Sequence, residues 1–366
     1  MSVTVDWWSA VLAGPGGSIS ESGEGERYLA LPTRRAARVV VDASNPVAIN
    51  DALSRMAEAR SLPGADVIAR VASRVAPQAA PSWTIHGGDD GSLRTHLKQI
   101  IGADVTLSIA IGPPRPNQKP VVRIYDGPDM VAIAKMGPDL HTASMVANEA
   151  RWLAELTAAP IADVQTAEVL HHGEFGPSDL LVMSPLPLAS DLGLSFDQMP
   201  TELLTSIANR APSVGLADSP YWMALLGRAQ PWGDADLERL LDNITSHPRF
   251  ESVATGLAHG DWSPWNIGRG IDGQWCVWDW ERAAVGVPLA FDLLHLHLQY
   301  GPEGFDGGLR GAAEASRLAG HADEDFDLAT TMYLAELLVR HHEANQTGSL
   351  RDEAVRQLIG SGADTV

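Results

Sequence analysis

The eight residues from His259 to Asn266 limit what this chain can fold into more than any other part of its sequence. They place Asp261 five residues before Asn266, in a segment rich in Gly, Ser and Pro, which are typical of turns. A short apolar strand is expected over 275–278, and Asp279 follows it directly. Two carboxylates and an amide oxygen can converge where such a loop meets such a strand, and hard oxygen ligands of this kind suit Mg²⁺.

A second pair of charged residues lies upstream. Lys135 ends an expected strand over 131–135, and Glu149 falls on the helix expected next, over 141–156. In protein kinases, a strand lysine held by a helix glutamate pairs with the α- and β-phosphates of the nucleotide. A phosphoryl-transfer site also needs a carboxylate that orients the attacking hydroxyl and oxygen ligands that hold the metal ion. The order of these groups along the chain therefore indicates phosphoryl transfer.

The same residues carry a resemblance to a known family. The catalytic-loop pattern H-G-D-x-x-x-x-N of the aminoglycoside phosphotransferase and choline kinase-like family matches His259–Asn266, and the family's metal-binding aspartate matches Asp279. The downstream segment Gly286–Leu293 resembles the part of that family that carries a structural aspartate, here Asp292. The resemblance covers roughly residues 100–345 and is weakest over the N-lobe, and it is absent from the first hundred residues.

The resemblance implies a small-molecule kinase of the α+β class with the two-lobed protein-kinase-like fold. Such an enzyme transfers the γ-phosphate of ATP directly to a hydroxyl group, and Asp261 would be its catalytic base. Asn266 and Asp279 would be Mg²⁺ ligands, and Glu281 would add a further metal ligand. The resemblance assigns the phosphate-positioning pair to Lys135 and Glu149, and the backbone contacts to the adenine to Met183, Ser184 and Leu186.

Three segments are expected along the chain. Residues 1–98 form an N-terminal extension, and residues 99–187 form an N-lobe with an antiparallel sheet, one key helix and the hinge. Residues 188–366 form a helical C-lobe that contains the catalytic loop. The patterns predict strands over 28–31, 38–41, 105–111, 121–125, 130–136, 168–172 and 180–183, two short strands between 265 and 280, and helices over 46–60, 141–156, 288–299, 325–344 and 350–360.

One loop departs from the family pattern. The segment Gly112–Gln118 holds one glycine and three prolines, where the phosphate-covering loop of this fold is often rich in glycine. Proline has no N–H group, so fewer backbone donors can reach a phosphate. Either this loop folds differently, or nucleotide contact depends more on Lys135 and the metal ions.

Composition excludes several classes of protein. The formal net charge of -20 speaks against nucleic-acid binding, which needs a cationic surface. The single cysteine, Cys276, excludes an internal disulfide framework and a Cys-rich zinc site. The N-terminal residues lack a basic region typical of a signal peptide, and no apolar run is long enough to cross a membrane. The expectation is a cytoplasmic protein with no nucleic-acid or membrane partner.

Each candidate residue also has a purely structural interpretation. Asp261 could be a turn residue or a helix cap, although its place in the HGDxxxxN pattern disfavours this. Lys135 could be an ordinary edge-strand lysine and Glu149 a solvated helix residue. Glu281 could simply pair with Arg282 or another cation.

Two tryptophans flank the candidate base. Trp262 and Trp265 could stack on a sugar or a cationic ring, or they could pack the loop against the C-lobe. The histidine pairs suggest a metal hydrolase as another alternative. However, His295 and His297 are two residues apart on an expected helix and therefore point apart.

The resemblance implies a phosphate acceptor that is a small molecule with a hydroxyl group. A sugar, an amino sugar or a related metabolite fits the acidic D-x-E segment and the tryptophans, and an aminoglycoside-type antibiotic is the alternative. A catalytically inactive binding module of the kinase fold is the alternative of another class, because a fold does not guarantee an activity.

Overall fold

The computed structural model describes residues 5–58, 81–88, 91–112, 117–189, 193–302 and 304–360. The chain divides into two compact units. The first unit contains the chain up to Ala150 and the segment Ala167–Pro185. The second unit contains Arg151–Thr166 and the chain from Leu186 onward. Prolines 113, 114 and 116 of the expected phosphate loop lie outside the described residues.

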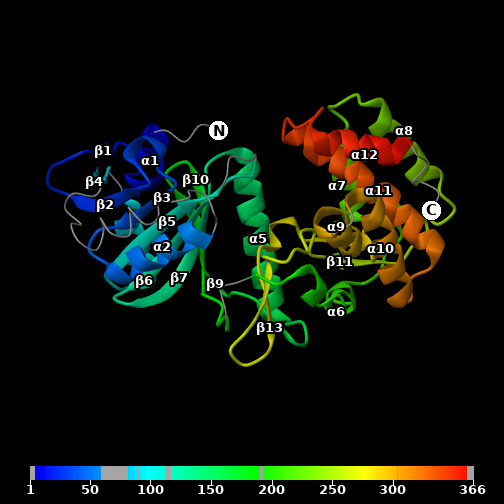
Figure 1. Ribbon diagram of the computed structural model, residues 1–366, viewed down its shortest axis with the longest axis horizontal. Coiled ribbons are helices and arrows are strands. Elements are labelled where there is room, and N and C mark those ends of the chain that lie inside the picture. Colours follow the sequence, from blue (N-terminus) through cyan, green and yellow to red (C-terminus); the bar gives the residue numbers. More distant parts are fainter. Residues whose placement is uncertain are drawn as a thin grey trace. The chain divides into compact units, whose positions relative to one another are not determined.

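An antiparallel sheet of nine described strands forms the framework of the first unit (Figure 1). Every pair of neighbouring strands in it is antiparallel. In the order in which they pair, the strands are β1 (Ser18–Ser20), β4 (Ser82–His86), β2 (Glu26–Leu31), β3 (Val39–Asp42), β5 (Val105–Ile111), β6 (Pro120–Asp126), β7 (Asp129–Gly137), β10 (Ser178–Met183) and β9 (Val169–Phe175).

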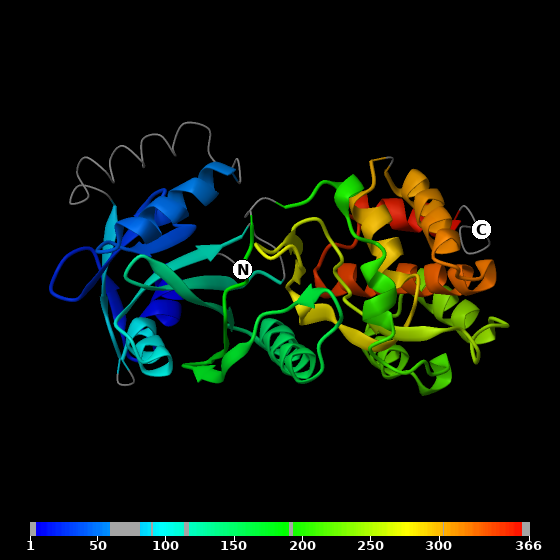
Figure 2. The same ribbon diagram turned by 90° about the horizontal axis from the view of Figure 1, so that it is seen from below.

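The sheet separates two apolar cores. Along β2, Tyr28 and Ala30 belong to one core and Leu29 and Leu31 to the other, as the alternation of side chains in a strand requires. Helix α2 (Pro46–Glu58) covers one face, and α1 (Val5–Leu12) and α4 (Leu93–Ile101) cover the other (Figure 2). The expected inner face of α2 is confirmed, since Ala48, Leu53 and Met56 are all buried.

The first hundred residues contribute strands to this same sheet. Strand β3 pairs with β5, where Val40 lies opposite Ile109. The first unit therefore differs in extent from the expected segments 1–98 and 99–187, because backbone hydrogen bonds join them across that boundary. The segment Arg151–Thr166 in turn groups with the second unit, where the indole Nε1 of Trp152 donates to the carbonyl oxygen of Ala283 at 2.7 Å.

A long buried helix organises the second unit. Helix α11 (Asp323–Glu343) is buried round most of its circumference, and its core includes Leu334 and Leu338. Figure 1 shows the other large helices of the unit grouped about it. These helices are α7 (Pro220–Ala229), α8 (Ala235–Ser246), α9 (Phe291–Tyr300), α10 (Gly304–Leu318) and α12 (Leu350–Gly360). Within the described chain, no helix combines the length and the apolarity that crossing a membrane requires.

Short strands and one short helix complete the second unit. A small sheet contains β12 (Ile267–Arg269), β13 (Trp275–Val277) and β8 (Val164–Gln165), which pairs parallel to β13. The other strands are β11 (Thr255–Ala258) and β14 (Ala284–Pro288), and the short helix is α6 (Leu203–Ala208). Helix α5 (Leu140–Ala158) belongs to both units, because the division falls at Ala150.

The helix expected over 288–299 begins later than predicted. Residues Ala284–Pro288 form β14, which pairs with β11 so that Thr255 lies opposite Pro288, and the helix begins at Phe291. The bounds of helix α10 were not predicted, and its glycines are unfavourable in a helix interior. They allow close packing on α9, since a Cβ on Gly308 would lie 2.6 Å from the carbonyl oxygen of His297.

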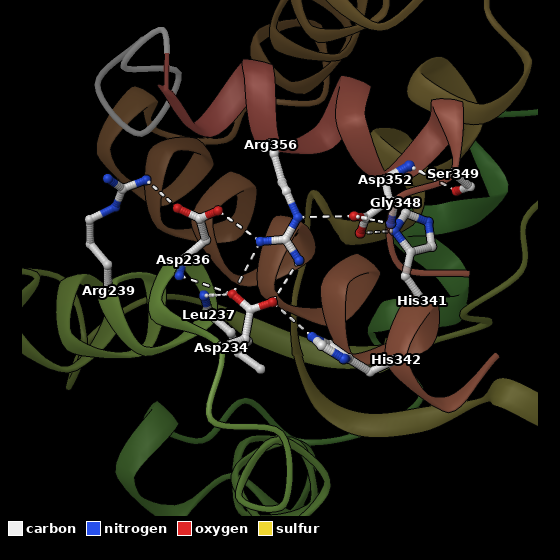
Figure 3. A network of polar contacts seen from close by, with 10 residues as sticks. All are labelled: Asp234, Asp236, Leu237, Arg239, His341, His342, Gly348, Ser349, Asp352 and Arg356. Carbon is white, nitrogen blue, oxygen red and sulfur yellow. Dashed lines mark hydrogen bonds and ion pairs between the residues drawn. The ribbon is translucent and has the colours of Figure 1, made fainter. Parts of the chain in front are cut away.

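A network of charged side chains ties α12 to α8 and α11 (Figure 3). Arg356 contacts Asp234 at 2.6 Å, Asp236 at 2.7 Å and Asp352 at 2.9 Å. Asp234 also caps the N-terminus of α8, and His342 of α11 lies 2.8 Å from its Oδ2. The hydrogen bonds from Arg356 hold the pKa of the Asp234 carboxyl well below its usual range.

Replacing Arg356 should destabilise the second unit. The substitution Arg356→Met leaves Asp234 and Asp352 without their shared cation, and we expect a loss of about 2–3 kcal/mol in the free energy of unfolding at pH 7, measured by urea denaturation. The matched control is Arg239→Met, whose cation is half-exposed and pairs only with Asp236, and it should cost less than about 0.5 kcal/mol.

The difference between wild type and Arg356→Met should also depend on pH. A carboxyl whose pKa is lowered by folding stabilises the folded state above its unfolded pKa, and this contribution is lost as the pH falls. The two stability curves should therefore converge below about pH 4, where the unfolded carboxyl takes up its proton. Curves that stay parallel down to about pH 2 would contradict this account.

Candidate active site

Asp292 accepts hydrogen bonds from the backbone of the loop that carries the candidate base. Its Oδ2 accepts a hydrogen bond from the backbone N–H of His259 at 2.7 Å, and its Oδ1 accepts one from Gly260 at 2.9 Å. Asp292 lies in the first turn of α9 and is buried. Strand β11 ends at Ala258, directly before His259, where the loop begins. The aspartate thus fixes the start of the loop to the helical core.

The side chain of His259 also fixes the loop. Its Nε2 lies 3.0 Å from the carbonyl oxygen of Trp278, to which it donates, and its Nδ1 accepts from the backbone N–H of Asp261 at 3.3 Å. The imidazole is fully buried and packs on the rings of Trp262 and Trp280. Both ring nitrogens are used in holding the loop, so His259 has a structural role.

Gly260 occupies a position that no other residue can take without strain. Its φ is 79°, in the left-handed region that favours glycine. A Cβ there would lie 2.4 Å from the carbonyl oxygen of Arg282. The glycine of the pattern is therefore required by the close approach of two backbone segments.

Asp261 and Asn266 are in direct contact, as the spacing of the pattern predicts. The Nδ2 of Asn266 donates to the backbone carbonyl of Asp261 at 3.0 Å and to its Oδ2 at 3.1 Å. With the amide nitrogen committed to Asp261, the amide oxygen of Asn266 is the atom that can coordinate a cation. Oxygen is also the ligand that Mg²⁺ prefers, so the residue present fits the metal expected here.

Asp261 is a carboxylate in this setting. Burial by itself raises the pKa of its carboxyl group, but the hydrogen bond from His295 and the charge of Arg282 outweigh burial. The pKa of Asp261 therefore lies well below its usual range. A carboxylate is the form that can accept a hydrogen bond from a hydroxyl group.

Asp279 follows β13 directly, as expected. Its φ of 67° is unusual for a residue other than glycine and marks a sharp change of direction at the end of the strand. Such sparsely populated backbone conformations gather at functional sites, where the surrounding structure maintains them. Glu281, two residues on, is buried in the short helical turn of residues 280–282.

The two tryptophans of the loop have different environments. Trp262 is fully buried, and its position agrees with the packing interpretation that the sequence left open. Its Nε1 has no hydrogen-bond partner among the described residues. Trp265 is 53% exposed and packs edge-on against Tyr300 of α9, with ring centroids 4.5 Å apart. Of these two loop tryptophans, Trp265 is the one exposed to solvent.

The first unit holds the expected lysine–glutamate pair. Lys135 lies on β7 and Glu149 on α5, and the lysine Nζ is 2.7 Å from each carboxylate oxygen. The side chain of Glu149 is 1% exposed and that of Lys135 is 12% exposed. The interpretations as an edge-strand lysine and a solvated helix glutamate are therefore wrong, since β7 pairs on both sides and the glutamate is buried.

The candidate adenine segment lies where the chain passes from one unit to the next. Met183 ends β10 and is buried. Ser184 is fixed to the neighbouring strand segment, because its backbone N–H donates to the carbonyl of Glu168 and its Oγ accepts from the N–H of Glu168, both at 2.9 Å. Leu186 is the first residue of the second unit after this segment.

His295 and His297 do not share a metal site with each other in the described part of the chain. His295 contacts Asp261 and His297 packs against Phe196, so the two point apart as predicted. The sequence suggested His295 only as a metal ligand of the hydrolase alternative, and no role beside Asp261 was predicted for it. A signal was present, because His295 lies three residues after Asp292 and therefore on the same side of α9.

Comparison with known proteins agrees with this geometry. A family model described as APH, phosphotransferase enzyme family, matches residues 117–327. No curated protein gives a significant match. Among solved structures, a thermostable mutant of aminoglycoside phosphotransferase APH(4)-Ia in ternary complex with ADP and hygromycin B is similar, with 14% identity and a TM-score of 0.50, and the alignment covers 74% of this chain and 97% of that one. This likeness confirms the expected α+β, protein-kinase-like fold.

Two further solved structures are also similar. One is a putative fructosamine-3-kinase from Haemophilus somnus 129PT, with 15% identity, a TM-score of 0.48 and coverage of 74% of this chain and 96% of that one. The other is macrolide 2'-phosphotransferase MphH from Brachybacterium faecium, with 19% identity, a TM-score of 0.43 and coverage of 74% and 97%.

Removing the carboxylate of Asp292 should release the loop. The substitution Asp292→Ala leaves two buried N–H groups without acceptors, at about 1–3 kcal/mol each. We expect amide hydrogen exchange at His259 and Gly260 to accelerate by at least about 100-fold, since 1.4 kcal/mol corresponds to a factor of ten. Asp292→Asn retains one acceptor oxygen and should accelerate exchange less. Exchange rates in Asp292→Ala equal to those of the wild-type protein would show that the carboxylate does not hold the loop.

Proposed function

Because the chain belongs to the phosphotransferase enzyme family, we propose that it transfers the γ-phosphate of ATP to a hydroxyl group of a sugar, an amino sugar or a related metabolite. The observation that carries the proposal is the contact between Asp261 and Asn266, which leaves one carboxylate for a hydroxyl proton and one amide oxygen for a metal ion. Both groups lie on a loop that Asp292 holds to the core.

Asp261 is the proposed catalytic base. Its carboxylate accepts a hydrogen bond from the acceptor hydroxyl and so directs the oxygen lone pair toward the γ-phosphorus. The new O–P bond forms as the bond from phosphorus to the β–γ bridging oxygen breaks, and ADP leaves with the electrons of that bond. The hydroxyl proton passes to Asp261 and then to solvent, so no phospho-enzyme is needed.

The remaining charged residues act on the triphosphate. We assign Lys135 to the α- and β-phosphates, held in position by Glu149. Asn266, Asp279 and Glu281 would hold Mg²⁺. Backbone groups at Met183, Ser184 and Leu186 would hold the adenine, with the exception of the N–H of Ser184, which already donates to Glu168. When bound, Mg²⁺ neutralises the charge that builds up on the phosphate oxygens.

The acceptor class is proposed from the exposed aromatic pair. The exposed indole of Trp265, which packs against Tyr300, could stack on the C–H face of a pyranose ring. Trp265 is in the same loop as Asp261. Hygromycin B in the APH(4)-Ia complex is an aminoglycoside, so an antibiotic of that type is the alternative acceptor. ATP in preference to GTP, and a cytoplasmic location, stay predictions.

Turnover should depend on Asp261. We would measure Mg²⁺-dependent ATP depletion across a panel of sugars, amino sugars, aminoglycosides and amino-alcohols. Depletion should require one acceptor class, and Asp261→Ala should lower kcat by at least about 100-fold while leaving the affinity for Mg-ATP nearly unchanged. The affinity can be measured separately by titration calorimetry.

Two results would overturn the proposal. Turnover in Asp261→Ala within tenfold of wild type would exclude Asp261 as the base. Absence of depletion with every acceptor, together with no thermal shift on addition of Mg-ATP, would favour a binding module of the kinase fold.

Replacing Trp265 should weaken binding of the acceptor alone. The substitution Trp265→Ala removes the exposed ring face, and we expect KM for the acceptor to rise roughly three- to tenfold with KM for ATP unchanged. The matched control is Trp232→Ala, which removes another partly exposed tryptophan, stacked on His342, and should change neither constant. An unchanged KM for the acceptor in Trp265→Ala would remove Trp265 from the acceptor site.

A further inference from the structure

The side chain of His295, on α9, is hydrogen-bonded to Asp261, the proposed catalytic base. Its Nε2 lies 2.9 Å from Oδ1 of Asp261, across 34 residues of sequence. The imidazole is 5% exposed, whereas the side chain of Asp261 is 22% exposed. Asp261 therefore has a different partner on each carboxylate oxygen, since Asn266 donates to its Oδ2.

A chain of hydrogen bonds fixes the imidazole of His295. Its Nδ1 lies 3.0 Å from the hydroxyl oxygen of Tyr333 on α11, and that oxygen lies 3.0 Å from Nε2 of Gln299. The amide Nε2 of Gln299 donates to the phenol oxygen, which leaves the phenol O–H able to donate to Nδ1 of His295. When Nδ1 accepts this bond, the imidazole proton lies on Nε2, facing Asp261.

We propose that His295 is a positioning residue for the phosphoryl transfer, which fixes the carboxylate plane of Asp261 through a neutral Nε2–H donor whose tautomer Tyr333 and Gln299 set. The proposal rests on the proposed function of Asp261. Two donors on different oxygens prevent rotation of the carboxylate about its Cβ–Cγ bond. Each oxygen keeps a second lone pair, and one of these accepts the acceptor hydroxyl.

The surroundings of the imidazole favour its neutral form. Burial lowers the pKa of His295, and the carboxylates of Asp261 and Asp292 counteract burial only in part, while Arg340 adds to the lowering. A neutral donor suits the role. An imidazolium would bind Asp261 as a charged pair and make it a weaker acceptor of the hydroxyl proton.

The hydrogen bonds that start at His295 pass through Tyr333, in a densely packed part of the molecule. Tyr333 is fully buried in the core about α11, and its ring packs edge-on against Phe291 of α9. Asp292, which holds the loop backbone, lies one helical turn before His295 on α9. One helix thus holds both the backbone of the loop and the side chain of its base. Small misplacements of such a group can lower a rate by about 100-fold.

The tautomer can be tested without any turnover. In the wild-type protein at pH 7, ¹⁵N-resolved histidine spectra should show His295 as a neutral ring protonated on Nε2, assigned by its loss in His295→Gln. In Tyr333→Phe the same ring should lose this tautomer preference. An imidazolium, or a ring protonated on Nδ1, in the wild-type protein would overturn the proposal whether or not the protein is a kinase.

The positioning role predicts a defined pattern of kinetics. His295→Gln keeps an N–H donor near the position of Nε2 and should retain kcat within about threefold. His295→Leu removes the donor and should lower kcat about 10- to 100-fold, with KM for ATP unchanged. In the Asp261→Ala background, His295→Leu should have no further effect on the residual rate, because it acts through Asp261.

Each outcome bears on the proposal. Equal losses of kcat in the Gln and Leu variants, or a further loss in the Asp261→Ala background, would show that His295 is only a packing residue. Thermal unfolding and Mg-ATP binding by each variant identify failure to fold. If the wild-type protein transfers no phosphate to any acceptor, the proposed function fails, and the spectra still decide the geometry of the His295–Asp261 bond.

Discussion

The bond between the carboxylate of Asp292 and two backbone N–H groups is the interaction on which the candidate site depends. A loop between two short strands has few backbone hydrogen bonds of its own, so its position depends on side-chain contacts such as those of Asp292 and His259. Asp292 connects it to α9, and α9 packs against the buried helix α11. The rigidity of the helical core is thereby transferred to the one carboxylate whose orientation matters for the chemistry.

The sequence predicted those parts of the site that depend on short spacings. The Asp261–Asn266 contact follows from five residues of loop, and the Lys135–Glu149 pair follows from a strand and the helix after it. The role of His295 was not predicted, because its contact with Asp261 spans 34 residues and its spacing from Asp292 was the one indication of it. The functions of these residues depend on a bound nucleotide and acceptor, so they stay predictions.

The fold shows the same division between local and distant information. Helix α2 was predictable from the periodicity of its apolar residues and from Asn45, whose side chain accepts from the first backbone N–H groups. Helix α4 was missed although Ser92 caps its start and Gly102 its end, since the expected boundary at 98 divided it. The pairing of β3 with β5 could not be predicted, because which strands meet in a sheet depends on the whole chain.

That pairing has a consequence for how the protein is made. Strands β2 and β3, which pair with each other in the folded sheet, precede β5 in the chain and leave the ribosome before it. An unpaired edge of a strand such as β3 is a template on which a later strand can align. In the finished sheet β5 is an interior strand, and the described sheet ends on that side at β1, which is only three residues long. The order of synthesis thus allows the N-terminal strands to be present before β5 emerges, and the folded sheet keeps only a short strand at that edge.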